Sequence, residues 1–408
     1  LLFRPGCRLR WHQMIEHKDI VISGGGIAGL VAAAAFGDAG FDVFCVDPTH
    51  PVTNRDAAGA DLRTTAYLQP GQVFLQAIGV WPLLTDRNAP LQVMRIVDAA
   101  SSDLVSKDFD ATDISDAPFG WNVGNWDMRD VLLSRIASLP NVVFEPGLST
   151  TSTNTRSTEA RIKLSDGRLM SCKLLIAADG RDSAIRKAAG IAAKRSEFGQ
   201  LALSFAVTHA MAHDNISTEV HKGGGPFTLV PLPDFECKPS SAVVWMDKIL
   251  DIQAMQALSV DEFNAEITAR SAGVLGPLSL ITARTAWPII SQLAGSFYSE
   301  RTAFIAEAAH VVPPIGAQGL NLSLGDIKAL LELAKASPSS IGELPMLKKY
   351  HRVRRPIAQS RVIGVGALNR ASKAEGPAAT RVRALGLDVI HRIAPLRRAL
   401  MHLGLGTR

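Results

Sequence analysis

Three glycines near the start of the sequence have the spacing of a phosphate-binding turn. Gly24, Gly26 and Gly29 follow the short apolar run DIVIS, and an alanine-rich segment extends from Ile27 to about Asp38. In such a turn the glycines allow the tight bend, the close approach of a pyrophosphate and the packing of helix on strand. The helix that follows offers free N–H groups and a positive dipole end to phosphates.

Asp47 completes this pattern. It ends a second apolar run, FDVFCVD, 18 positions after Gly29, and an acid at this place can accept hydrogen bonds from ribose hydroxyls. The order of strand, turn, helix, strand and acid predicts a dinucleotide site. Its residues are Gly24, Gly26, Ile27, Ala28, Gly29 and Asp47. The alternative is a glycine-rich turn in some other α/β unit.

The composition is that of a globular protein with a large core. Of the 408 residues, 47% are hydrophobic and 20% are charged, which is typical of soluble domains. The four cysteines form no CxxC pair, so we expect neither a disulfide framework nor a metal site, and a cytoplasmic location. Residues 1–14 carry arginines and lack a continuous apolar segment, so we expect a disordered leader rather than a signal peptide.

Charge is distributed unevenly along the chain. From Lys348 to Arg408 there are 14 Lys and Arg against two acids, although the whole chain has a net charge of only +5. A basic C-terminal region on an acidic body predicts an anionic partner such as the inner face of a membrane. No nucleic-acid recognition motif accompanies these charges, so nucleic acid is not expected as a partner.

The order of elements predicts an α/β protein with a discontinuous, Rossmann-like dinucleotide-binding domain, which the resemblance given below makes an FAD/NAD(P)-binding domain. Residues 15–75, 120–195 and 288–345 are assigned to this domain. Residues 76–119 and 196–287, with alternating segments such as LALSFAV and SAVVWM, predict an inserted antiparallel sheet that would bind substrate. Residues 346–408 predict basic C-terminal helices. Apolar residues there step by three or four from Val382 to Leu403, with Pro395 expected to kink or restart the helix.

Two further segments complete a resemblance to a known family. Residues 174–186 read LLIAADGRDSAIR, and residues 306–326 read AEAAHVVPPIGAQGLNLSLGD. Together with the glycine turn, and in the same order, they resemble the motifs of single-component flavoprotein aromatic hydroxylases, which have the p-hydroxybenzoate hydroxylase fold. Within that family, the variants DLRTTAYLQPG, FTLVPLPD and IGAQGLNL are similar to the ubiquinone-biosynthesis hydroxylases. The similarity runs from about Asp19 to Arg408.

This resemblance implies a reaction and its partners. The substrate would be a hydrophobic prenylated phenol in ubiquinone biosynthesis, hydroxylated on its aromatic ring with O2 through a C4a-hydroperoxyflavin. FAD would be bound non-covalently. NAD(P)H would be a transient co-substrate, because the sequence has no second glycine-turn unit. A membrane surface or other ubiquinone-biosynthesis proteins are further expected partners.

The resemblance also implies the site residues. Gly319, Leu320 and Asn321 would lie at the flavin, and Pro313 and Pro314 would form a wall facing it. Arg63, Asn125, Asp179 and Glu307 would contact the cofactor. No acid or base residue is assigned, and His310 is expected to be structural.

One departure from the family motif bears on activity. Ala306-Glu307 stands where the family usually has Gly-Asp. A glutamate keeps the charge that bonds the ribitol but is one methylene longer. A tolerated variant and a non-catalytic FAD-binding or scaffold relative both stay open, as does a hydroxylase of another hydrophobic phenol. Two-Rossmann disulfide reductases and flavin halogenases are disfavoured, the latter because their WxWxIP signature is missing.

Overall fold

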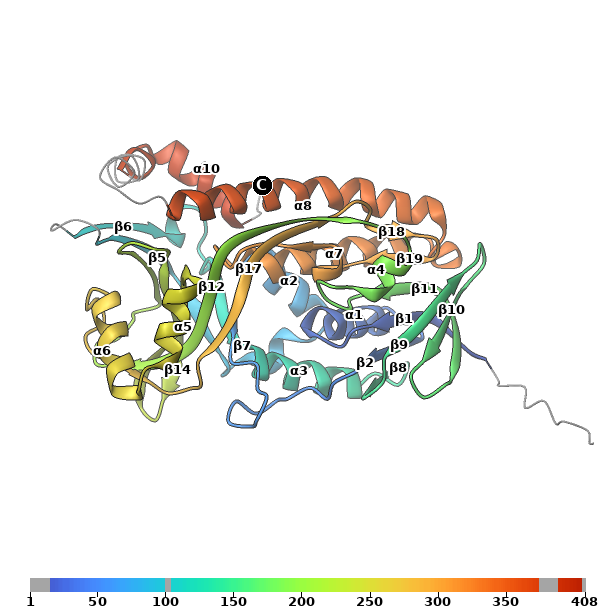
Figure 1. Ribbon diagram of the computed structural model, residues 1–408. Coiled ribbons are helices and arrows are strands. Elements are labelled where there is room, and N and C mark those ends of the chain that lie inside the picture. Colours follow the sequence, from blue (N-terminus) through green and yellow to red (C-terminus); the bar gives the residue numbers. More distant parts are fainter. Residues whose placement is uncertain (1–14, 100–103, 374–387, 406–408) are drawn as a thin grey trace, which may run out of the picture.

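The computed structural model describes residues 15–99, 104–373 and 388–405. It contains three sheets, and Figure 1 shows the two larger ones at opposite ends of the molecule, with long strands running between them. The structure confirms the predicted α/β class. The expected leader, residues 1–14, lies outside the described residues.

The first sheet has parallel strands at its centre. Its order is β18-β19-β11-β1-β2-β8, and β10 and β9 extend from β11. Strands β1, β2, β8, β11 and β19 are parallel to one another, while β10 and β18 pair antiparallel with β11 and β19. Their bounds are β1 Glu16–Ser23, β2 Val43–Asp47, β8 Val142–Pro146, β9 Thr150–Thr155, β10 Ala160–Leu164, β11 Leu169–Ala177, β18 Tyr298–Ser299 and β19 Thr302–Phe304.

Helices cover this sheet and share its core. Residues 28–37 of α1 are buried almost without exception, because the helix packs against α3 and α7 as well as against the strands. A helix that is apolar on all sides is stable only when it is buried on all sides. The helices are α1 Ile27–Asp38, α2 Gln69–Ala77, α3 Asn125–Ala137, α4 Ala184–Ala188, α7 Gln318–Ala336, α8 Leu344–Ser372 and α10 Ala394–Leu405, with short 3-10 turns at Trp81–Leu84, Ala111–Asp113, Ala306–Ala308 and Pro338–Ser340.

The second sheet has nine strands and is mostly antiparallel. Its order is β20-β17-β12-β15-β14-β13-β5-β6, and β16 also pairs with β12. Helices α5 Ile249–Ala257 and α6 Val260–Arg270 bury Ile252, Phe263 and Ile267 in its core. The strands are β5 Val93–Asp98, β6 Val105–Asp110, β12 Ala193–His209, β13 Ile216–His221, β14 Phe227–Phe235, β15 Lys238–Lys248, β16 Leu278–Leu280, β17 Thr285–Ala294 and β20 His310–Val311.

Two long strands join the two halves of the molecule. Strands β12 and β17 pair from Ala193↔Ala294 to Ser204↔Thr285, and both curve across the molecule in Figure 1. The domain boundaries expected at residues 195/196 and 287/288 therefore fall inside strands. A third, small sheet of β3 Thr64–Leu68, β7 Gly120–Gly124 and β4 Asn88–Leu91 lies beside them. The division into domains stays a prediction.

Candidate functional site

The glycine turn connects β1 to α1 at the carboxyl end of the parallel strands. Gly24 has φ +112°, and a Cβ there would lie 2.3 Å from the carbonyl oxygen of Ala178. A Cβ on Gly29 would lie 1.8 Å from the carbonyl oxygen of Gly24. Neither position admits a side chain, so both glycines are required by packing.

Gly26 differs from these two glycines because it faces open space. No atom lies within 4 Å of the position that its Cβ would take, and no side chain caps the first turn of α1. The first N–H groups of a helix have no partner within the helix. The turn therefore leaves an open cradle with free N–H donors, which fits the pyrophosphate of a dinucleotide.

Asp47 holds this turn from the end of β2. Its Oδ2 accepts a hydrogen bond from the Gly25 N–H at 2.6 Å, and its Oδ1 accepts from the backbone N–H and the hydroxyl of Thr49 at 2.8 and 2.6 Å. A carboxylate has about four lone-pair sites, so capacity remains for a ribose hydroxyl. Gly25 was not predicted as a site residue, although the run of three glycines indicated it. A Cβ on Gly25 would lie 2.7 Å from the ring of Phe144, so this position also requires glycine.

A partly buried ionic network includes Arg63. Its Nε and Nη2 each donate to Asp61 at 2.7 Å, and Asn125 Nδ2 donates to the same carboxylate at 2.9 Å. Burial alone would raise the pKa of Asp61, but the hydrogen bonds and charge of Arg63, with Asn125 and Arg129, hold the pKa below its ordinary value. The structure thus brings the predicted residues Arg63 and Asn125 together.

The Arg63 guanidinium also faces the second sheet. It lies over the ring of Trp287 on β17, 5.2 Å from the ring centroid, a geometry that attracts a cation to the ring face. Asp61 and Trp287 were both missed as site residues. Asp61 is two positions from Arg63 and could have been found from the ion-pair spacing, whereas nothing in the sequence indicates Trp287.

Asp179 organises the segment after β11. Its Oδ1 accepts from the Ser183 hydroxyl at 2.6 Å, and its Oδ2 accepts from the Ile185 N–H at 3.2 Å. Arg186 is buried and donates to the carbonyl oxygens of Ala308 and Arg181 at 2.7 and 3.0 Å. The motif therefore ties its own loop to the loop that follows β19, and contact of Asp179 with the cofactor stays a prediction.

Glu307 lies in that second loop. Its Oε2 is 3.2 Å from Arg181 Nε, and its side chain is 44% exposed. Ala306 has φ +52°, a left-handed conformation that glycine adopts without the steric cost that alanine has there. This explains why glycine usually occupies the position and shows that the loop keeps its shape with alanine.

The Glu307 carboxylate gives a direct test of this loop. Glu307→Ala is expected to weaken FAD binding by about 1.5 kcal/mol, roughly a tenfold rise in dissociation constant. The Glu307 side chain is half exposed, so the lost hydrogen bond should have an energy at the lower end of the range for charged groups. Glu307→Asp should bind FAD about as well as the parent. Titration of the apoprotein with FAD measures both, with Glu300→Ala, an exposed acid on the hairpin before β19, as control. An unchanged affinity in Glu307→Ala would show that this acid does not reach the cofactor.

The start of α7 is fixed by Asn321. Its Oδ1 accepts from the Leu68 N–H at 3.0 Å, and its Nδ2 donates to the carbonyl oxygens of Ala66 and Ala317 at 2.8 and 2.7 Å. Asn321 thus joins α7 to β3, and no side chain caps the helix. The N-terminal N–H groups of α7 and its dipole are available to a negatively charged ring edge.

The residues flanking this helix start differ in exposure. Pro313 is buried and Pro314 is exposed, while Gly319 is exposed and Leu320 is half-buried. Of the two prolines, only Pro314 is exposed enough to face a bound ring. Their role at the flavin stays a proposal.

His310 lies in a buried network behind the site. Its Nε2 is 2.5 Å from Asp326 Oδ2, and Asp326 Oδ1 accepts from Arg354 Nε at 2.7 Å. Burial would raise the pKa of Asp326, but the charges of His310 and Arg354 hold it below its ordinary value. His310 is therefore packed and bonded inside the protein, in agreement with the structural role that we expected.

The turn, the acid after β2 and the uncapped helix α7 define a dinucleotide-binding flavoprotein. A model of the family described as FAD binding domain matches residues 17–363. The chain belongs to this family, and its cofactor is FAD. Among the described residues, no group of three or more His, Cys, Asp and Glu side chains could hold a metal ion.

Similarity to individual proteins extends over almost the whole chain. The "Ubiquinone hydroxylase UbiL" of Rhodospirillum rubrum is 29% identical over 392 residues, covering 95% of this chain and 90% of that protein. The "3-demethoxyubiquinol 3-hydroxylase" of Escherichia coli is 24% identical, covering 96% and 99%. The crystal structure of p-nitrophenol 4-monooxygenase PnpA from Pseudomonas putida has the same fold, with a TM-score of 0.79, 17% identity and coverage of 97% and 100%.

Proposed function

We propose that this protein is an FAD-dependent monooxygenase that hydroxylates the aromatic ring of a polyprenyl phenol in ubiquinone biosynthesis, using NAD(P)H and O2. The observation that carries the proposal is the similarity to ubiquinone hydroxylases over 95% of the chain. The glycine cradle and the uncapped start of α7 support it. Ubiquinone intermediates are phenols with long apolar tails, so the enzyme would act at the cytoplasmic face of a membrane.

When bound, FAD supplies the redox chemistry: it takes a hydride from NAD(P)H and activates O2. The protein's own residues bind and orient the ring. The N–H groups at the start of α7 stabilise negative charge on the ring edge, and Pro314, which has no N–H, adds no donor beside it.

Apolar side chains next to this helix can exclude water from the reaction. Phe198, Ala202, Met246 and Ile289 form a buried cluster, and Trp287 and Ile315 pack against it. Ile315 follows Pro314 directly, so the cluster adjoins the proposed flavin wall. We assign it to the phenol ring and the first part of the prenyl chain, which need a dry, apolar lining.

A genetic comparison tests the function. A strain that lacks the gene should accumulate a prenylated phenol one ring oxygen short of the next intermediate, and the parent gene should remove it. The variant Gly26→Val, which should not hold FAD, separates catalysis from a scaffold role: it should fail to restore ubiquinone. If it restored ubiquinone as well as the parent, the non-catalytic alternative would be favoured.

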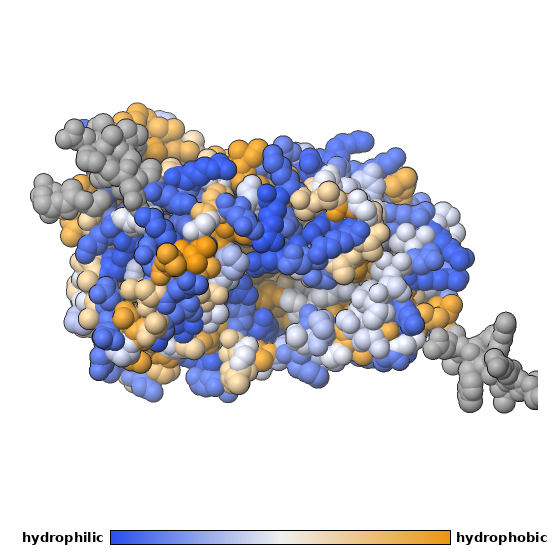
Figure 2. Space-filling model, viewed as in Figure 1, coloured by the Kyte–Doolittle hydropathy of each residue, from blue (hydrophilic) through white to orange (hydrophobic). Residues whose placement is uncertain are grey.

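The C-terminal helix supports contact with a membrane. Five apolar residues spaced by three or four positions are exposed by 38–63%: Leu396, Leu400 and Leu403 on α10, and Val389 and Ile393 just before it. Figure 2 shows hydrophobic residues gathered where Figure 1 places α10. This exposure supports contact with another surface over packing of the stripe on the FAD domain. Arg381, Val382, Arg383 and Leu385 lie outside the described residues.

Polar contacts, rather than the apolar stripe, hold α10 on the protein. Arg397 forms two hydrogen bonds with Asp113 at 2.9 and 3.1 Å, and Gln318 Nε2 donates to the Gly404 carbonyl at 2.9 Å. Arg397, one of the basic C-terminal residues, is therefore paired within the protein. Arg392 pairs with Asp388 at 2.7 Å but stays exposed, and Arg398 is exposed. In the part of the chain that the structure describes, no helix has the length and apolarity of a membrane span.

Replacing the stripe should release the protein from membranes. The triple variant Leu396→Ser, Leu400→Ser, Leu403→Ser is expected to bind liposomes of anionic lipid roughly tenfold or more weakly, because each leucine loses its apolar contact with the interface. FAD content should not change. Flotation measures binding, and Val73→Ser, Leu250→Ser, Val260→Ser, three exposed apolar residues elsewhere, is the matched control. Equal flotation of both triple variants and the parent would assign the stripe to another partner.

A further inference from the structure

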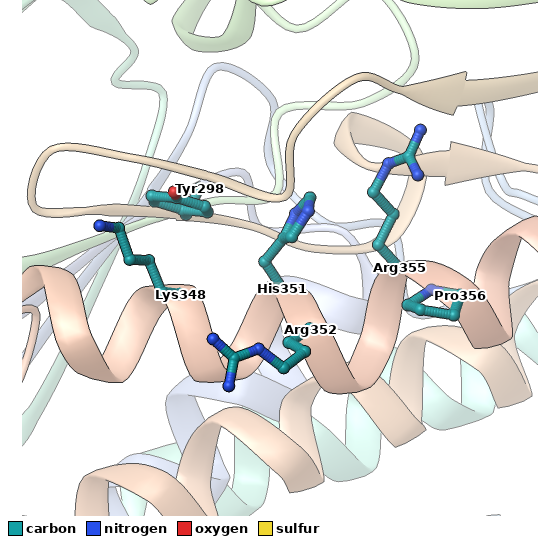
Figure 3. Close-up of a pocket in the computed structure, with 6 residues that line it drawn as sticks. All are labelled: Tyr298, Lys348, His351, Arg352, Arg355 and Pro356. Atoms are coloured by element: carbon teal, nitrogen blue, oxygen red, sulfur yellow. The ribbon is translucent and has the colours of Figure 1, made fainter.

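A cationic pocket lies against helix α8. Its volume is about 330 Å³, and it is lined by Tyr298, Lys348, His351, Arg352, Arg355 and Pro356. Figure 3 shows five of these on successive turns of one helix, below the hairpin that carries Tyr298, with His351 and Arg355 pointing toward that hairpin. Nothing in the proposed reaction uses these residues.

The cations of this pocket have no acidic partners among the described residues. Lys348 and Arg352 are in no salt bridge there, and Arg355 donates to neutral oxygens, the Ala294 carbonyl at 3.3 Å and Gln359 Oε1 at 3.2 Å. Lys348 and Arg352 are four positions apart, a spacing at which like charges destabilise a helix. An anion between them would remove this repulsion.

His351 adds a neutral donor to the pocket. Its Nδ1 accepts a hydrogen bond from the Phe297 N–H at 3.2 Å, so the proton of the neutral ring is on Nε2. Burial and the charge of Arg355 lower the pKa of His351, which keeps the ring neutral at physiological pH. Lys348, Arg355, the His351 N–H and the Tyr298 hydroxyl are groups that bind an oxyanion such as a phosphate, whereas Arg352 points away from the hairpin in Figure 3.

The pocket is separate from the cofactor turn. Tyr298 belongs to β18, the edge strand of the first sheet, and β19 and β11 lie between it and β1. Three strand spacings amount to about 14 Å. A second cavity of about 220 Å³ continues along α8 and includes Lys194, Gln359, Ile363 and Arg370. The cationic surface thus follows the helix rather than the dinucleotide site.

Exposed apolar residues suited to a membrane contact lie on α10 rather than beside the pocket. Val353 and Ile357 are exposed on α8, but at about 100° per residue they lie on the opposite side of the helix from Lys348, His351 and Arg355. Helix α10, with its exposed stripe, lies near the far end of α8 on the same side of the molecule (Figure 1).

We propose that this pocket binds the phosphate of an anionic phospholipid headgroup. The proposal rests on the proposed function in that a prenylated substrate places the enzyme at a bilayer. It adds a specific headgroup site to the apolar contact made by α10.

Charge reversal in the pocket tests this with the full chain. The variant Lys348→Glu, Arg352→Glu is expected to lower partitioning onto phosphatidylglycerol-containing vesicles by roughly thirty-fold or more, since each basic residue at an anionic surface contributes severalfold. The control Lys163→Glu, Lys238→Glu changes the net charge equally at two exposed lysines on β10 and β15 and should change partitioning less than about threefold. FAD content should be that of the parent in all variants.

Three results would overturn the headgroup site. One is unchanged partitioning of the pocket variant, and another is an equal loss in the control, which would show that only net charge matters. The third is binding of millimolar glycerol phosphate in the pocket by a protein that does not bind vesicles. That result would assign the pocket to a soluble phosphate. Hydroxylation of a detergent-solubilised phenol is measured separately: its absence alongside pocket-dependent vesicle binding would refute the proposed function and leave the headgroup site standing.

Discussion

Gly26→Val is expected to abolish FAD binding while the chain still folds. The position of the new side chain is open in the protein, with no atom within 4 Å of its Cβ, so the variant creates no internal clash. The same space is the cradle in front of the free N–H groups of α1, where the pyrophosphate must approach the backbone closely. We expect a loss of at least about a hundredfold in affinity, because the phosphate contacts with a helix N-terminus are lost together.

The measurement is flavin absorbance of the purified protein, followed by titration with FAD. The matched control is Gly364→Val in helix α8, where the Cβ also meets no atom within 4 Å and no cofactor is expected. Gly29→Val would not serve, because its Cβ would lie 1.8 Å from a backbone oxygen and misfolding would obscure the result. Undiminished flavin in Gly26→Val, with native circular dichroism, would refute the assignment of this turn.

Asp326→Asn is expected to destabilise the protein by about 3–5 kcal/mol at pH 7, because it leaves the buried Arg354 without its carboxylate. Asp326 is fully buried, and its two oxygens bond His310 and Arg354 at 2.5 and 2.7 Å. Urea unfolding measures the loss. The exposed pair of Asp108 and Arg95 provides the control: Asp108→Asn should cost less than about 1 kcal/mol.

The pH dependence follows from the lowered pKa of Asp326. A carboxyl with a pKa lower in the folded state than in the unfolded state stabilises the protein above the unfolded value, and this contribution is lost as the pH falls through the folded value. The difference in free energy of unfolding between the parent and Asp326→Asn should therefore persist at neutral pH. It should become smaller only below about pH 4.

A double change checks the cause of this loss. Asp326→Asn with Arg354→Met removes the stranded charge and should recover part of the stability. If the double variant were less stable than Asp326→Asn, the stranded guanidinium would not be the cause. If Asp326→Asn alone lost under 1 kcal/mol, the network would contribute little to the fold.

The sequence alone determined the cofactor unit. Glycine spacing, the alanine-rich helix and the acid after the second strand are local features, and local backbone requirements such as φ +112° at Gly24 leave a direct mark on residue type. The family resemblance was confirmed for the same reason: each of its three motifs is a short segment whose geometry depends mainly on its own residues. The start of α6 Val260–Arg270 is local in the same way, because its Ser259–Glu262 capping box lies within four residues.

The tertiary structure decided which distant side chains meet. Arg63 lies over Trp287 although 224 positions separate them, and His310, Asp326 and Arg354 share one buried network from three elements. It also decided that Arg397 bonds Asp113 while the apolar stripe of α10 faces outward. Periodicity in a sequence shows that a helix has an apolar face, but which surface that face meets depends on long-range packing, and no local propensity encodes it.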